Sequence, residues 1–148
     1  MVCAAGNTGP EDGSISEMAS SRKVLTVGCH DGRYCKNDPG RCETYSGRGR
    51  YDVTRKPDIV APGTRILSCN AFWQNRNGRI YRPYVAKSGT SMATPIVSGA
   101  AALAMEKYPG ITNEEFVRLL SLTATDLGEP WNKQGFGMLN VRRLLENK

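Results

Sequence analysis

The chain has 148 residues, of which 39% are hydrophobic and 23% charged, and its formal net charge is +6. This composition excludes a collagen-like, coiled-coil or wholly disordered chain, and the length suits one domain. No apolar run approaches the roughly 20 residues that a membrane-spanning helix needs, so we expect no membrane partner.

The positive charge is concentrated between Arg33 and Lys87, a stretch with twelve Lys or Arg residues and four Asp or Glu residues. A basic segment of this kind can bind nucleic acid, but no RNA-recognition or helix-turn-helix signature accompanies it. We therefore interpret it as a solvated, loop-rich basic face and expect no nucleic-acid partner.

The five cysteines are an odd number, so at least one thiol is unpaired or pairs between chains. Their spacing contains no CxxC, and a mixed Cys/His site would depend on His30, the only histidine. From these residues we expect no structural metal and no cofactor. Unpaired thiols favour a reducing compartment, so the sequence favours a cytoplasmic location, with secretion left open.

Strand-like segments dominate the first ninety residues. A short apolar run stops at Gly6 and Asn7, and a second run rich in β-branched residues precedes a long polar connection over 30–56. The expected strands are 2–5, 23–29, 58–61 and 65–69, and a hairpin is expected over 71–87.

The last third of the chain predicts helices. Residues 91–108 carry few charges and are apolar on nearly all sides, which predicts a buried helix with Pro95 in its first turn. Thr112 with Glu115 forms a capping box for a second helix, and Asn140 suits the N-cap of a third. Strands followed by a buried helix predict an α/β layered domain.

Two polar residues lie where chemistry could occur. Ser91 opens the predicted buried helix beside Gly89 and Thr90, so unpaired N–H groups at the positive helix end would face negative charge developing on a substrate. Asn7 follows a strand, at the sheet end where α/β proteins bind ligands. The alternatives are an N-cap serine and a turn asparagine.

Three segments together resemble the subtilisin-like serine peptidases: AAGN at 4–7, KPDIVAPG at 56–63 and GTSMATP at 89–95. The segment from 127 to 144 also looks like the C-terminal end of bacterial members. The resemblance implies an α/β fold, namely the C-terminal part of a doubly wound, mostly parallel sheet with a buried central helix after the nucleophile.

The resemblance also implies roles for single residues. Ser91 matches the nucleophile that attacks a peptide carbonyl and carries the acyl-enzyme, and Asn7 matches the amide that joins the Ser91 backbone N–H in the oxyanion hole. The matched substrate-binding residues are Ala4, Ala5, Gly6, Gly89 and Thr90.

The family's Asp and His motifs, which lie in its N-terminal half, are absent from this sequence. His30 lacks the HGT surroundings of the family's base, so we interpret it as a surface loop histidine. We therefore expect residues 1–148 to be the C-terminal part of a serine endopeptidase domain that is inactive alone. Calcium binding is possible in the full-length family member, although no DxDxDG-type loop occurs here.

The expected partners are a peptide or protein substrate and the N-terminal half of the domain. An unpaired strand edge beside residues 2–5 further predicts self-association. The alternative to an enzyme is a non-catalytic relative that binds peptides or a protein partner through the same groove.

Overall fold

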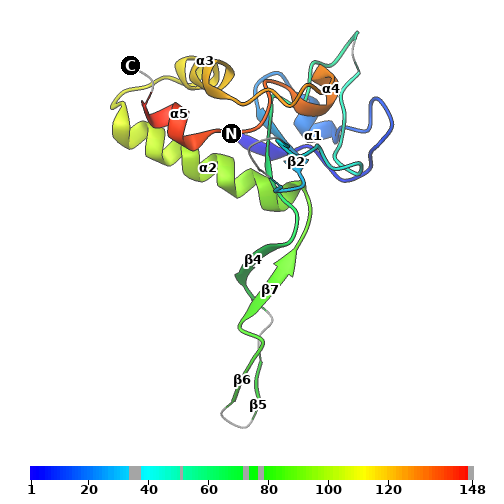
Figure 1. Ribbon diagram of the computed structural model, residues 1–148, viewed down its shortest axis with the longest axis vertical. Coiled ribbons are helices and arrows are strands. Elements are labelled where there is room, and N and C mark those ends of the chain that lie inside the picture. The colour runs from blue at the N-terminus through cyan, green and yellow to red at the C-terminus, as the bar shows by residue number, and fades with distance from the viewer. Residues whose placement is uncertain (34–37, 51, 72–73, 77–78, 147–148) are drawn as a thin grey trace.

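A computed structural model describes residues 1–33, 38–50, 52–71, 74–76 and 79–146 (Figure 1). A three-stranded parallel sheet runs through the body, in the order β1 (Val2–Ala4), β2 (Leu25–His30) and β3 (Ile59–Pro62). Every residue of the central strand β2 is buried. Parallel strands that are covered on both faces have nearly continuous apolar sequences, and this pattern is why the sequence predicted a strand at 23–29.

One long helix, α2 (Thr90–Lys107), packs against all three strands. The short α1 (Glu17–Ser20) contacts β1 and β2, and α3 (Asn113–Thr123), α4 (Trp131–Gln134) and α5 (Val141–Glu146) follow α2. The predicted α/β fold with a mostly parallel sheet is confirmed.

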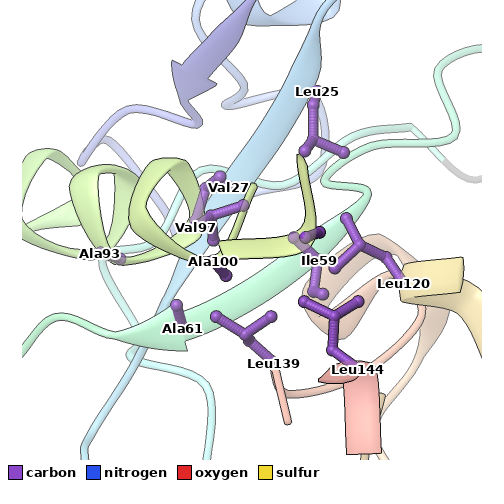
Figure 2. Close-up of a cluster of buried hydrophobic side chains, with 11 residues drawn as sticks. Leu25, Val27, Ile59, Ala61, Ala93, Val97, Ala100, Leu120, Leu139 and Leu144 are labelled. Carbon is purple, nitrogen blue, oxygen red and sulfur yellow. The ribbon is translucent and has the colours of Figure 1, made fainter. Parts of the chain in front are cut away.

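The core lies between the sheet and the helices. Figure 2 shows Val27 of β2 next to Val97 and Ala100 of α2, with Leu120 and Leu144 closing the far side. These side chains are at most 2% exposed. Full burial of a Val or Leu side chain stabilises the fold by about 1.5–3 kcal/mol. The packing of this cluster therefore holds α2 against the sheet.

Helix α2 buries one side rather than nearly all sides. Its buried residues recur every three or four positions, while Leu103 is 44% and Met105 58% exposed. The prediction of burial on nearly all sides was wrong because Ala and Gly make a helix apolar on every side, yet such small residues can remain exposed to solvent. Pro95 is the sixth helical residue rather than a first-turn residue, so the Ser91 carbonyl loses its usual N–H partner there.

Two antiparallel pairs extend from the body as a narrow arm, which we define as residues 64–88. The strands β4 (Ile66–Cys69) and β7 (Tyr84–Lys87) form its base, and β5 (Gln74–Arg76) and β6 (Arg79–Tyr81) pair farther out (Figure 1). The hairpin predicted over 71–87 therefore also includes the strand predicted separately at 65–69; residues 72–73 and 77–78 lie outside the described part.

Both predicted helix caps are confirmed. Thr112 and Glu115 form a reciprocal capping box on α3, and the side chain of Asn140 accepts a hydrogen bond from the Arg143 N–H. The four-residue helices α1 and α4 are too short to give a helical period and were missed. Among the described residues, no helix combines the length and the apolar character needed to cross a bilayer.

Candidate active site

The three family-like segments meet at the carboxyl end of the parallel sheet. The chain leaves β1 at Gly6, leaves β3 at Gly63 and enters α2 at Gly89. The Gly89 N–H donates to the Gly63 carbonyl at 2.9 Å. A Cβ atom at Gly63 would lie 2.6 Å from the Cys29 Sγ and 2.8 Å from the Gly89 oxygen, so only glycine permits this approach.

The Asn7 side chain is held by Thr90. Its Oδ1 accepts hydrogen bonds from the Thr90 N–H at 2.9 Å and from the Thr90 hydroxyl at 3.1 Å. The Thr90 hydroxyl in turn accepts from the Gly6 N–H at 3.2 Å. A backbone N–H can only donate, so the oxygen of the Asn7 amide must face Thr90 and its Nδ2 must face the other way.

The first turn of α2 leaves one backbone donor available. The Thr90 N–H is bonded to Asn7, and the N–H groups of Met92 and Ala93 are directed to the Gly89 carbonyl, at 2.9 and 3.4 Å. Within the described part of the chain, the Ser91 N–H has no such partner. The Asn7 Nδ2 likewise has no hydrogen-bond partner among the described residues, so two donors at this helix end are unpaired there.

Gly89 keeps this end of the helix uncovered. Its φ is +149°, a conformation that strains other residues, and an added Cβ would contact the Asn7 amide nitrogen at 3.4 Å. Gly89 and Thr90 are buried, whereas Ser91 is exposed. The Ser91 hydroxyl forms no hydrogen bond with the residues that the structure describes. An exposed hydroxyl therefore lies next to two donors at the positive end of a helix.

The predicted substrate-binding residues of β1 lie beside this site with different burial. Ala4 and Gly6 are half-buried and Ala5 is fully buried. The Ala5 carbonyl accepts from the Ser16 N–H at 2.8 Å, and the Ala4 carbonyl accepts from the Ser16 hydroxyl at 3.3 Å. The segment before α1 thus fixes this strand end from outside the sheet.

His30 is not the surface loop residue that we expected. It ends β2 and is fully buried. Its Nδ1 accepts from the Gly32 N–H at 3.0 Å, which leaves Nε2 to donate to the Pro39 carbonyl at 2.9 Å. Both ring nitrogens are engaged, so His30 is no base for Ser91.

A buried thiol underlies the site without competing with Ser91. The Cys29 Sγ lies 3.2 Å from the Tyr45 hydroxyl, and burial raises the pKa of the thiol above its usual value. Burial also raises the pKa of Tyr45 to about 12. Cys29 therefore stays protonated at neutral pH and is a poor nucleophile. This contact was not predicted from the sequence, because it joins β2 to a loop that has no periodic pattern.

Within 1–33, 38–50, 52–71, 74–76 and 79–146, no group of three or more His, Cys, Asp or Glu side chains is placed to hold a metal ion.

A groove of about 780 Å³ opens at the amino end of the sheet, between Val2, Met105 and Phe116. It lies at the opposite sheet end from Asn7 and is no part of the candidate site.

Comparisons with known proteins show what the chain is similar to. The sequence model of the Subtilase family matches residues 1–138. The chain is 38% identical to the Serine protease AprX of Bacillus subtilis, over 95% of this chain and 34% of that protein. It is 33% identical to the Halolysin-like extracellular serine protease Nep of Natrialba magadii, over 95% of this chain and 22% of that protein.

A solved structure with the same fold is the S41 Psychrophilic Protease, with a TM-score of 0.76 and 27% identity. The match covers 95% of this chain and 47% of that one. The chain therefore spans between about a fifth and a half of the proteins that it resembles here.

Proposed function

This chain belongs to the subtilase family of serine peptidases, and from that membership we propose that Ser91 is the nucleophile of peptide-bond hydrolysis. The observation that carries the proposal is the pair of unpaired donors, the Ser91 N–H and the Asn7 Nδ2, beside an exposed hydroxyl. Hydrogen-bond donors beside a reacting hydroxyl can stabilise the oxyanion that forms when the hydroxyl adds to an amide carbonyl.

The proposed reaction runs through an acyl-enzyme. The Ser91 Oγ adds to the carbonyl carbon while its proton passes to a base, and the oxygen that becomes negative is held by Asn7 and the Ser91 N–H. The base then protonates the leaving amine, the C–N bond breaks, and water releases the acyl group by the same steps in reverse. The substrate is a peptide or protein.

The base in this proposal comes from another polypeptide segment. His30 is the only histidine of the sequence, and both of its ring nitrogens are engaged elsewhere. Without a base, a serine hydroxyl is a weak nucleophile at neutral pH. In a subtilisin, loss of the histidine lowers turnover by about 2 × 10⁶-fold, and we expect residues 1–148 alone to be inactive on that scale.

A fluorophosphonate probe tests the assignment of Ser91. We expect no labelling of residues 1–148 alone, and labelling of Ser91 in a chimera in which they replace the matching part of AprX. The same chimera with Ser91→Ala is the control and should stay unlabelled. A chimera that is folded by circular dichroism but unlabelled would contradict the assignment of Ser91, whereas labelling of Ser91 in the isolated chain would contradict the proposal that the base comes from another segment.

Two variants of the chimera test the oxyanion donors. Asn7→Ala should lower turnover by about 10²–10³-fold with little change in KM, the magnitude established for the matching amide of a subtilisin. Thr90→Val keeps the N–H that orients Asn7 but removes the hydroxyl, so the loss should be at most about tenfold. Equal losses for both variants would show that Asn7 does not act on the oxyanion.

The second candidate is a non-catalytic relative that binds peptides or a protein partner through the same groove. The exposed Ser91 and the unpaired donors favour the enzyme, because binding alone requires neither. A chimera that binds peptide substrates but forms no acyl-enzyme would support this alternative.

We also propose that a second copy of the chain pairs with β1 when no other polypeptide covers it. β1 is an edge strand, and the apolar groove beside Val2 adjoins the exposed Met105 of α2. Such an edge invites strand pairing. Sedimentation should show concentration-dependent dimers, and a monomer at all concentrations would exclude this pairing.

Two further properties, the cellular location of the protein and its calcium dependence, can be tested directly. The free thiols of Cys3, Cys29, Cys42 and Cys69 favour the cytoplasm, whereas the relative Nep is named an extracellular protease. Fractionation of the source cells distinguishes the two. Calcium dependence of the full-length protein is tested by the effect of a chelator on its thermal unfolding.

A further inference from the structure

A group of polar side chains lies behind the backbone turn that leads to Ser91, and the proposed reaction does not use it. We call it the Glu43 cluster, and its members are Cys29, Glu43, Tyr45 and Thr64. Its shortest contact is the hydrogen bond that the Thr64 hydroxyl donates to the Glu43 carboxylate at 2.5 Å. A hydrogen bond to an ionised group is about twice as strong as one between neutral groups. This contact therefore dominates the cluster.

The carboxylate of Glu43 is held on a fixed support. The Glu43 N–H donates to the Cys29 carbonyl at 2.8 Å, and the Cys29 N–H donates to the Ser46 hydroxyl at 2.9 Å. The segment 43–46 is thus attached to β2 at both of its ends. Glu43 forms no ion pair with the residues that the structure describes, so its carboxylate remains available to Thr64.

The other members of the Glu43 cluster surround the end of β3. The Tyr45 hydroxyl lies 3.2 Å from the Cys29 Sγ and 3.5 Å from the Thr64 hydroxyl oxygen. The sulfur lies directly against Gly63, because a Cβ added there would be 2.6 Å from it. Gly63 has no side chain of its own, so its position depends on these neighbours.

Thr64 lies between two hydrogen bonds that join the end of β3 to the segment before α2. The Gly63 carbonyl accepts from the Gly89 N–H at 2.9 Å, and the Arg65 N–H donates to the Ser88 hydroxyl at 2.9 Å. Because peptide units are planar, a displacement of Thr64 also moves the residues on both sides of it. The hydroxyl that Glu43 holds therefore controls both connections.

We propose that Glu43 is a positioning residue for the proposed peptidase reaction. Its carboxylate holds Thr64, and Thr64 keeps the Gly63 carbonyl against the Gly89 N–H. The first turn of α2 then presents the hydroxyl and the N–H of Ser91 in one fixed orientation. A misplacement of about 1 Å can lower turnover by about 10²-fold, so one remote hydrogen bond is enough to affect the rate. The inference rests on the proposed function, but one of its tests does not require catalysis.

Turnover of the AprX chimera tests the role of the carboxylate. Thr64→Val and Glu43→Met should each lower kcat by about three- to tenfold, the range for one hydrogen bond, with KM unchanged. Glu43→Gln keeps an oxygen that accepts from Thr64 and should retain most of the turnover. Urea unfolding shows which variants are folded under the assay conditions.

Three results of this assay would overturn the inference. Unchanged kcat in both Thr64→Val and Glu43→Met would show that the bond does not affect the reaction. A change of KM alone would place Glu43 in contact with the substrate. Equal losses for Glu43→Gln and Glu43→Met would show that the charge, and not the bond to Thr64, is what matters.

A double variant shows whether Glu43 acts through Thr64. Glu43→Met combined with Thr64→Val should lower kcat no more than the larger of the two single changes, because both remove the same bond. Multiplied losses would mean that Glu43 acts by another route. Thr123→Val is the matched control, since it removes a hydroxyl that donates to the Leu119 carbonyl at 2.7 Å inside α3. A loss there equal to that of Thr64→Val would also overturn the inference.

Amide hydrogen exchange in residues 1–148 measures the same link without catalysis. The Gly89 N–H is bonded to the Gly63 carbonyl, so its exchange reports how often that bond opens. We expect Thr64→Val and Glu43→Met to speed its exchange by about three- to tenfold, and Glu43→Gln and Thr123→Val to leave it near the wild-type rate. Unchanged exchange in Thr64→Val and Glu43→Met would overturn the link.

The failure of this inference differs from that of the proposed function. If Ser91 of the chimera is labelled but Thr64→Val changes neither kcat nor the exchange of Gly89, the positioning role is wrong and the proposed function stands. If the folded chimera is never labelled, the proposed function is wrong and the catalytic role of Glu43 is wrong with it. The exchange of Gly89 then still shows whether Glu43 holds this turn.

Discussion

The parallel sheet and the arm are continuous in the chain, yet they are stabilised in different ways. Ile59 of β3 is fully buried, whereas Leu67, eight residues later in β4, is 69% exposed. At the sheet end, Gly63 and Gly89 approach within hydrogen-bond distance. The base of the arm is the strand pair β4 and β7, whose Leu67 and Tyr84 side chains are exposed on one face. The first region limits which residues can occupy it, and the second leaves its residues available for partners.

The largest effect that this comparison predicts is on the buried side. Ile59→Ala removes a side chain that fills the core between sheet and helices, so it should lower the free energy of unfolding by about 2–5 kcal/mol. Urea unfolding followed by circular dichroism measures it. A loss below about 1 kcal/mol would show that the core between the sheet and the helices is not tightly packed.

Close backbone approach gives the next largest effect. Gly63→Ala would bring a methyl group against the Cys29 Sγ and the Gly89 carbonyl, and we expect a loss of about 1–3 kcal/mol from overpacking. Gly99→Ala is the matched control, because an added Cβ there meets no atom within 4 Å. It replaces glycine inside an exposed helix turn and should stabilise the chain by about 0.5–1 kcal/mol. Equal effects at both sites would contradict the proposed contact.

The difference in packing between the sheet and the arm also explains which features could be predicted from the sequence. The parallel strands and α2 were predictable because close packing restricts those segments to a few residue types, whereas the contact of Asn7 with Thr90 at the start of α2 is visible only in the structure. The burial of His30 was not predictable, since it depends on a hydrogen bond between its ring and the Pro39 carbonyl, nine residues away in a segment with no periodic pattern. The pairing of β4 with β7 was missed for a similar reason, because no pattern in 66–69 identifies its partner.

The N-cap of α3 tests whether an exposed residue of the body can also contribute to stability. Thr112 caps α3 through its hydroxyl, and Thr112→Ala should cost about 1 kcal/mol. Ser121→Ala, which removes an exposed hydroxyl inside the same helix, is the control and should change stability by less than about 0.5 kcal/mol. A similar cost for both would mean that the cap contributes nothing specific.

The contribution of the capping box to the free energy of unfolding should also depend on pH. The backbone N–H of Thr112, and then its hydroxyl, lower the pKa of Glu115 below the ordinary value of 4.5. The ionised carboxylate therefore stabilises the folded chain above pH 4.5, and this contribution is lost as the pH falls through the lowered pKa. The stability difference between the wild-type chain and Thr112→Ala should shrink on acidification. A difference that grows at low pH would reverse the assignment.

The smallest predicted effect lies in the arm and completes the contrast with Ile59. Leu67→Ala removes a side chain that is 69% exposed, so the free energy of unfolding should change by no more than about 0.5 kcal/mol. Urea unfolding followed by circular dichroism measures this change. Because Leu67 and Ile59 are both aliphatic and of similar size, a large stability loss at Leu67 would mean that the arm is covered in solution and that the two regions are stabilised alike.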